Sequence, residues 1–255
     1  MTEFIEHPLI KPETIEARTY QSVLAARVLE NPSSLVVAPT ALGKTIVAVM
    51  VAAHLLQKYP DKKILILAPT RPLCEQHKES FRKFLNIPEE KIITLTGTTE
   101  QKLRNNEWEN ASVICATPQT IENDIITERI DLSELEACIF DETHRAVKEY
   151  SYVFIGKQLN ALKRKPLILA LTASPGASKE KIEEICTNLG IENIEIKTLQ
   201  DADVQEYIKP IDMEIRYVEL PKETKEIAEH LRAFVKEKLE ELKALHLVRT
   251  AEINQ

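Results

Sequence analysis

Seven short runs of apolar, mostly β-branched residues recur along the chain, and stretches with helical character separate them. Within each run the apolar residues are continuous, which is typical of strands covered on both faces. The runs occupy residues 34–40, 63–69, 91–97, 112–118, 137–143, 167–174 and 193–199. Helices are expected at 43–58, 72–85, 99–107, 118–128, 151–164 and 178–188. This alternation predicts an α/β fold with a doubly wound, mainly parallel sheet.

The predicted strands share a second property, because almost every one ends in Pro, Thr, Gly, Asp or Ser. In open parallel sheets, ligands bind outside the carboxyl ends of the strands. The chemistry of this chain is therefore expected at those ends.

Composition narrows the class of protein. The 255 residues are 44% apolar with no uninterrupted apolar run of membrane-spanning length, and the N-terminal residues carry acids and prolines where a signal peptide needs basic and then apolar residues. We therefore expect a cytoplasmic protein with no membrane partner. The net charge of −7 argues against long-range attraction of a polyanion, so any nucleic acid must be held by local contacts. The four cysteines show no CxxC pair, which favours buried thiols over a zinc site or disulfides.

A candidate phosphate-binding loop, APTALGKT, follows the first predicted strand at residues 38–45. Such a loop presents backbone N–H groups to phosphate oxygens, and Gly43 lets the backbone approach closely. Lys44 is expected to reach the β and γ phosphates, and the Thr45 hydroxyl to ligate Mg²⁺. The GxxxxGK[ST] pattern begins with glycine, where this chain has Ala38. An ordinary helix start is the alternative, but the strand before the loop and the apolar helix after it favour a nucleotide site.

An acidic pair ends the fifth predicted strand in the sequence ACIFDETH, residues 137–144. A nucleotide site needs a carboxylate beside the metal ion and a group that activates the attacking water. Asp141 is expected to take the metal side, and Glu142 to act as the general base. Lys44, Asp141 and Glu142 are thus the expected catalytic residues. The alternative, an acidic surface turn, is disfavoured by the loop at 38–45.

The pattern changes after residues 213–221, MEIRYVELP, which resemble a strand. Residues 222–255 predict a helical arm with one apolar side. That side either packs on its own domain or needs a partner from another chain. We expect two domains, 1–210 and 211–255.

Six motifs in this order resemble those of superfamily 2 helicases of the DExH type. They are APTALGKT, APTRPLCEQH (68–77), TG (96–97), ATPQT (116–120), DETH (141–144) and LTASPG (171–176). The chain is most similar to the archaeal Hef helicases, of the FANCM and RIG-I-like branch, over roughly residues 15–210. The resemblance implies a RecA-like P-loop domain, the first motor domain of an ATP-dependent DNA helicase or translocase that acts on branched or forked DNA in repair. It also implies ATP and Mg²⁺ as cofactors and single-stranded or branched DNA as partner.

The resemblance also implies roles for individual residues. Gln21 in the sequence RTYQ would hydrogen-bond the adenine base, supported by Arg18 or Tyr20. The expected nucleotide-binding residues are Arg18, Gln21, Thr40, Gly43, Lys44 and Thr45, of which Thr45 and Asp141 would serve the metal ion. A single-strand track is expected along Pro69, Thr70, Arg71, Thr96, Gly97, Thr117, Pro118 and Gln119. His144 would hydrogen-bond Thr172 and Ser174 and so couple the two sites. Thr143 stands where the family commonly has Ala or Cys, a sterically mild difference.

The family hydrolyses ATP between two RecA-like domains, and the second domain supplies arginine fingers. This chain shows one set of strands and no QxxGRxxR-like stretch, and residues 222–255 look like the start of a truncated helical insertion. We therefore expect the chain alone to bind ATP, to hydrolyse it slowly and not to unwind duplexes, with the second domain supplied in cis or in trans.

Three alternatives remain open at this stage. An RNA-directed DExH ATPase is consistent with the RIG-I-like relatives, and a noncatalytic nucleotide-binding half of a split motor is consistent with the tail. A P-loop ATPase unrelated to helicases is disfavoured by the TPQ and TAS elements. Translocation polarity and oligomeric state are not determined by these patterns.

Overall fold

The computed structural model describes residues 3–148, 150–173, 179–207, 218, 221 and 222–245. The expected coupling residue Ser174, most of the expected strand at 213–221 and the last ten residues of the expected helical arm lie outside this part. The chain divides into two compact units, Met1–Ile208 and Lys209–Gln255.

The first unit is built on a seven-stranded sheet in which every strand pairing is parallel. Its strands are β1 (Ser33–Val37), β2 (Lys63–Leu67), β3 (Ile92–Leu95), β4 (Val113–Ala116), β5 (Leu135–Phe140), β6 (Leu167–Thr172) and β7 (Asn193–Ile196). They lie in the order β3-β4-β2-β5-β6-β1-β7. The predicted doubly wound parallel sheet is confirmed.

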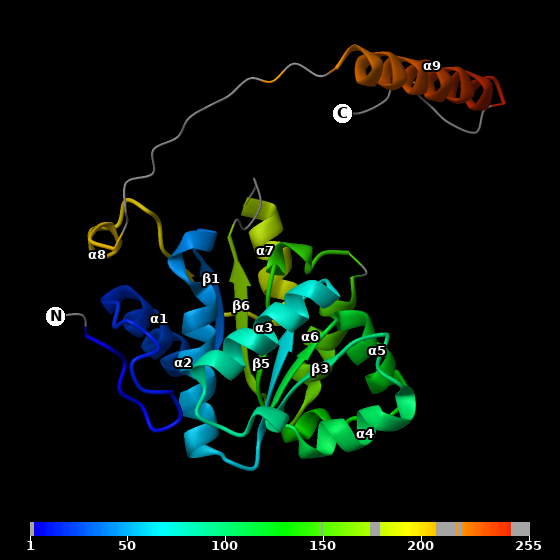
Figure 1. The fold of residues 1–255 in the computed structure, drawn as a ribbon. Coiled ribbons are helices and arrows are strands. Elements are labelled where there is room, and N and C mark those ends of the chain that lie inside the picture. The colour runs from blue at the N-terminus through cyan, green and yellow to red at the C-terminus, as the bar shows by residue number, and fades with distance from the viewer. Residues whose placement is uncertain (1–2, 149, 174–178, 208–217, 219–220, 246–255) are drawn as a thin grey trace. The chain divides into compact units, whose positions relative to one another are not determined.

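Helices cover both faces of the sheet (Figure 1). They are α1 (Thr19–Glu30), α2 (Lys44–Lys58), α3 (Arg71–Phe84), α4 (Gln101–Asn110), α5 (Pro118–Ile126), α6 (Ser151–Ala161), α7 (Lys179–Leu189) and the short α8 (Ala202–Gln205). The six helices expected between strands are present, with ends shifted by up to three residues. Helix α1 is not among the predicted helices, because it precedes the first strand and lies outside the strand–helix alternation.

Two hydrophobic layers hold these helices on the sheet. On one face, α1, α2 and α3 pack through side chains such as Leu24, Val51 and Phe81. On the other, α4 to α7 pack through side chains such as Trp108 and Tyr152. The central strands β2, β4, β5 and β6 are almost wholly buried, which explains their continuous apolar runs.

The strand register brings the seven carboxyl ends to one edge of the sheet. Leu95 of β3 pairs with Ala116 of β4, which is level with Leu67 of β2. Leu67 pairs with Phe140 of β5, and Val37 of β1 pairs with the end of β6 at Thr172. Each sequence motif follows one of these ends, so the register gathers the motifs along a single edge.

One stretch, Thr40–Lys58, is long and apolar enough to span a membrane, with a mean hydropathy of 1.4 over its best window. It consists of α2 and the turn before it. Half of that window is buried inside the domain, as in a core helix, and the sheet-facing residues of α2 belong to the first hydrophobic layer.

The second unit contains one described helix, α9 (Lys222–Ala244). None of its residues is buried, and apolar side chains such as Ile227, Leu231 and Phe234 are about 60% exposed. The expected helix at 222–255 is thus found as far as Ala244.

Candidate nucleotide and nucleic-acid site

The phosphate-binding loop is shaped by Gly43, which begins α2 in the left-handed backbone region at φ +69°. A Cβ at this position would lie 2.7 Å from Gln21 Nε2. Gln21 Nε2 and Tyr20 Oη both donate to the carbonyl of Leu42, at 3.0 and 3.1 Å. Buried side chains of α1 therefore hold the loop in a form that only glycine at 43 permits.

Lys44 lies across the same loop, where its Nζ donates to the Ala38 carbonyl at 2.7 Å. Burial lowers the pKa of Lys44, while the charges of Asp141 and Glu142 act in the opposite direction. The ammonium is thus within electrostatic range of both carboxylates, as its expected catalytic role requires.

Asp141 follows β5 and is anchored on three sides. Its amide donates to the Leu67 carbonyl at 2.9 Å, and its own carbonyl accepts from Tyr152 Oη at 2.7 Å. Its carboxylate Oδ2 lies 2.8 Å from His77 Nε2 on α3. Backbone and side chain of Asp141 are therefore both fixed.

Glu142 adopts the left-handed backbone region at φ +51°, which is uncommon for a residue with a side chain. Strain of this kind concentrates where a side chain must be aimed. Glu142 Oε2 lies 3.2 Å from His144 Nδ1, and both side chains are partly exposed. The general-base candidate is thus oriented by its backbone and by a neighbouring imidazole.

The coupling of the nucleotide site to the track through His144, Thr172 and Ser174 stays a prediction, and a separate contact joins the ends of β5 and β6. Thr143 is buried, and its Oγ1 donates to the Phe140 and Leu171 carbonyls at 3.0 and 2.8 Å. The described ion-pair partner of His144 is Glu142, and Thr172 is buried at the end of β6. Thr143, which differs from the family's usual Ala or Cys, therefore ties the acidic pair to the sixth strand.

A cavity of about 390 Å³ lies beside the phosphate-binding loop. It is lined by Phe4, Thr14, Ile15, Glu16, Arg18, Gln21, Gly43, Ile46 and Phe84. The two residues expected on the adenine side, Arg18 and Gln21, thus line one pocket with the loop. Apolar walls and a few polar groups suit a nucleotide base.

The residues present fit a nucleotide and a divalent cation. Gly43 forms a cradle that a Cβ would disturb, and the cation donors would be the Thr45 hydroxyl and the Asp141 carboxylate, hard oxygen ligands that suit Mg²⁺. In the described residues, no group of three or more His, Cys, Asp and Glu side chains is arranged to hold a metal ion alone. Thr40 is exposed at the start of the loop's 3₁₀ turn.

The expected single-strand track falls at three adjacent strand ends. Thr96 and Gly97 follow β3, Thr117 follows β4, and Pro69 and Thr70 follow β2. We call the ends of β3, β4 and β2 the nucleic-acid half of the edge, and the ends of β5, β6 and β1 the nucleotide half. Strand order alone separates the two predicted sites into neighbouring halves.

The predicted track residues differ in how far they are exposed to solvent. Thr70, Arg71, Gly97 and Gln119 are exposed, and Pro69 and Thr117 are partly exposed. Thr96 and Pro118 are buried. The Thr96 amide donates to Thr99 Oγ1, and its hydroxyl contacts Thr98 Oγ1, so both groups serve the turn itself. Helices α3 and α5 begin at this half of the edge, with N-terminal N–H groups suited to phosphates.

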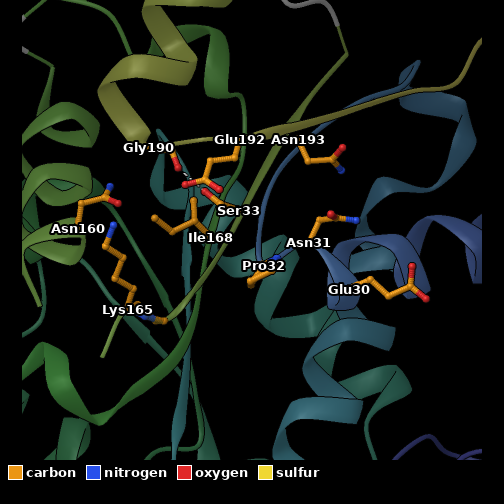
Figure 2. Close-up of a pocket in the computed structure, with 11 residues that line it drawn as sticks. Glu30, Asn31, Pro32, Ser33, Asn160, Lys165, Ile168, Gly190, Glu192 and Asn193 are labelled. Carbon is orange, nitrogen blue, oxygen red and sulfur yellow. Dashed lines mark hydrogen bonds between the residues drawn. The ribbon is translucent and has the colours of Figure 1, made fainter. Parts of the chain in front are cut away.

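Another cavity, of about 400 Å³, lies at the opposite edge, at the amino ends of β1, β6 and β7 (Figure 2). Lys165, Glu192 and Asn193 line it, and Ser33 donates a hydrogen bond to the Gly190 carbonyl there. None of the motif residues reaches it. Because parallel sheets bind ligands at the carboxyl ends of their strands, we place the functional site at the other edge.

Several contributors were missed from sequence. His77 and Tyr152 contact Asp141, and Phe4 and Phe84 line the pocket beside the loop. His77 lies in the APTRPLCEQH motif, but its contact depends on β2 and β5 being neighbours, which the sequence does not state. Phe4 lies far before the loop and carries no local signal.

A family model described as DEAD/DEAH box helicase matches residues 18–182, more than half of the chain. The chain belongs to this helicase family. Such a domain implies ATP binding with a divalent cation.

Several similar proteins support the Hef and FANCM branch for this helicase domain. The crystal structure of the Pyrococcus furiosus Hef helicase domain is 43% identical, with a TM-score of 0.78 over 97% of this chain and 53% of that one. A Methanocaldococcus jannaschii protein named as an ATP-dependent RNA helicase, MJ1505, is 46% identical over 94% of this chain and 30% of its own length. The Drosophila melanogaster DNA helicase Fancm is 33% identical over 92% of this chain and 16% of its own. The helicase domain thus spans less than a third of these curated relatives.

Proposed function

We propose that this helicase domain is the first motor domain of an ATP-dependent DNA helicase or translocase of the Hef type, acting on branched or forked DNA in repair. The observation that carries the proposal is the carboxyl edge of the sheet. There the loop with Lys44 and the acidic pair occupy one half, and the exposed residues of the track occupy the other.

In this proposal the nucleotide half performs the chemistry. The base lies in the pocket lined by Arg18 and Gln21, and backbone N–H groups around Gly43 bind phosphate oxygens. Thr45 and Asp141 hold Mg²⁺, which when bound neutralises charge on the phosphates. Glu142 orients the attacking water and accepts its proton, with its carboxylate held beside His144.

The nucleic-acid half binds the strand mainly through backbone groups. The N-termini of α3 and α5 offer N–H groups to successive phosphates, and Thr70, Arg71 and Gln119 add side-chain contacts. Contacts of this kind need little net positive charge, which agrees with a net charge of −7.

A second RecA-like domain, in cis or in trans, is proposed to complete the motor. Arginine fingers contribute about 10³ to 10⁵ in rate to phosphoryl transfer, so a chain without them should turn over far below the ~10 s⁻¹ of a typical enzyme. We propose that these 255 residues alone bind ATP, hydrolyse it slowly and do not unwind duplexes.

The test is ATP hydrolysis by the isolated chain with and without forked DNA. We expect a turnover below about 0.01 s⁻¹, the ordinary value reduced by the missing fingers, and no strand separation. Rapid, strongly DNA-stimulated turnover would contradict the incomplete-motor proposal. Absence of nucleotide binding would contradict the motor-domain proposal itself.

RNA-directed activity is the second candidate, since the M. jannaschii relative carries an RNA helicase name. Competition between forked DNA and duplex RNA for the chain, measured by fluorescence anisotropy, separates the two. Preference for the DNA supports the leading proposal, and preference for the duplex RNA supports this second one.

A further inference from the structure

The carboxylate of Asp141 has a side-chain partner that no helicase motif role explains. His77 Nε2 lies 2.8 Å from Asp141 Oδ2. Their side chains are only 8% and 14% exposed, so the bond is largely shielded from water. The contact joins the second turn of α3 to the end of β5.

The remaining contacts of Asp141 and of His77 show what this bond adds. Leu67 and Tyr152 hold the amide and the carbonyl of Asp141, and neither restrains its carboxylate. In the described part of the chain, His77 Nδ1 is buried without a hydrogen-bond partner, so Nε2 makes the ring's hydrogen bond. A carboxylate accepts, and Nε2 therefore carries the donated proton.

The buried residue of α3 nearest to His77 in sequence carries no charge. Cys74 lies one turn before His77 and is buried, and burial raises the pKa of its thiol to about 12. Cys74 is therefore neutral, and its Sγ contacts the Ala68 carbonyl at 3.6 Å. The hydrogen bond from His77 is thus the contact from α3 that the described structure places on the carboxylate.

We propose that His77 is a positioning residue for Mg²⁺, an inference that rests on the proposed nucleotide site. By donating a hydrogen bond to Oδ2, His77 would fix the rotation of the Asp141 carboxylate and leave Oδ1 outside this bond, available to a cation. Partners behind metal-side ligands typically change metal affinity 10- to 100-fold when they are removed.

The test compares His77→Leu with His77→Gln, whose amide N–H can replace Nε2–H. Binding of a fluorescent ADP is measured at increasing Mg²⁺ and in EDTA. We expect His77→Leu to raise the half-saturating Mg²⁺ concentration about 10-fold, with affinity in EDTA changed less than about twofold. His77→Gln should recover most of the Mg²⁺ dependence. Cys74→Ala, one turn away in the same buried face, should leave it unchanged.

Other results of this binding experiment would overturn the proposal. An unchanged Mg²⁺ midpoint in His77→Leu, or an equal loss of affinity with and without Mg²⁺, overturns the positioning role while leaving the nucleotide site intact. A wild-type chain that binds no nucleotide overturns both proposals.

A second measurement does not depend on whether the His77→Leu variant folds. Nitrogen NMR of the wild-type imidazoles, with the His77 signal assigned by its loss in His77→Gln, should show the proton on Nε2. A proton on Nδ1 alone overturns the inference.

Discussion

The two halves of the carboxyl edge hold their functional groups differently. In the nucleotide half, buried side chains act on side chains or on the loop. Gln21 holds the Leu42 carbonyl, and His77 holds Asp141. In the nucleic-acid half, the exposed residues lie at helix starts and in the turn after β3, and the buried contacts fix the backbone beneath them. In the proposed function, catalysis would therefore depend on positioned side chains, and strand binding mainly on positioned backbone.

The buried support of the nucleic-acid half is an ion pair. Arg104 Nη1 lies 2.9 Å from Asp124 Oδ1, with side chains 6% and 0% exposed. Arg104 Nε also donates to the Thr99 carbonyl in the turn after β3. This pair links α4 and α5 under the predicted track.

Glu142→Gln gives the largest expected effect and tests the nucleotide half. Losing the general base should slow hydrolysis by about 10² to 10⁴, while nucleotide affinity changes less than about threefold, because the amide keeps the side chain's size. Single-turnover hydrolysis with enzyme in excess measures the rate. Unchanged turnover would remove Glu142 from its assigned role.

Arg104→Met tests the support of the nucleic-acid half. Asp124 keeps Arg129 Nη1 at 3.2 Å, so losing Arg104 should cost about 1.5 to 3 kcal/mol of unfolding free energy, below the about 3 to 5 kcal/mol of a buried charge left with no partner. Urea unfolding followed by the chain's single tryptophan, the buried Trp108 on the same helix, reports it. The control is the exposed Arg71→Met, expected within about 0.5 kcal/mol in stability. Equal effects would show that burial of the pair is not what stabilises this half.

Alanine substitutions of Gly43 and Gly97 compare the two halves, with expected effects of intermediate size. Gly43→Ala should destabilise by about 1 to 2 kcal/mol from its left-handed backbone alone, with a further cost for displacing Gln21. Gly97→Ala meets no atom within 4 Å and should be nearly neutral. Urea unfolding of both variants measures the difference in unfolding free energy. Similar losses in the two variants would contradict the conclusion that the backbone requires glycine at 43 but not at 97.

Thr143→Val is the smallest expected change. Removing the hydroxyl that bridges the β5 and β6 ends should cost about 1 kcal/mol, and Thr143→Ser should retain most of that stability. Urea unfolding measures both variants. A valine variant as stable as the wild type would show that the bridge contributes nothing.

The fold was predictable because its strands are buried on both faces. The continuous apolar runs at β2, β4 and β6 are typical of strands buried on both faces. The helices between the strands then predict a parallel sheet. Helix α1 could not be predicted in this way, because its position before β1 follows from packing against α2 and not from strand alternation.

The candidate site residues that belong to short contiguous motifs could be predicted from the sequence. Gly43, Lys44, Asp141 and Glu142 belong to short motifs, and each motif follows a strand end. His77, Tyr152 and Phe4 act through contacts across the sheet or from the N-terminal segment, which depend on strand order and register. Thr96 and Pro118 belong to motifs too, but burial depends on the turn geometry around them.

The central claim is that the loop at 38–45 and the acidic pair form a nucleotide site in this chain by itself. Titration of a fluorescent ADP with Mg²⁺ into the wild type and into Lys44→Met tests it most directly. We expect saturable binding to the wild type and a loss of at least about 30-fold in the variant, the cost of removing a charged partner from phosphate. Equal affinity in the two proteins, or no binding to the wild type, would contradict the account.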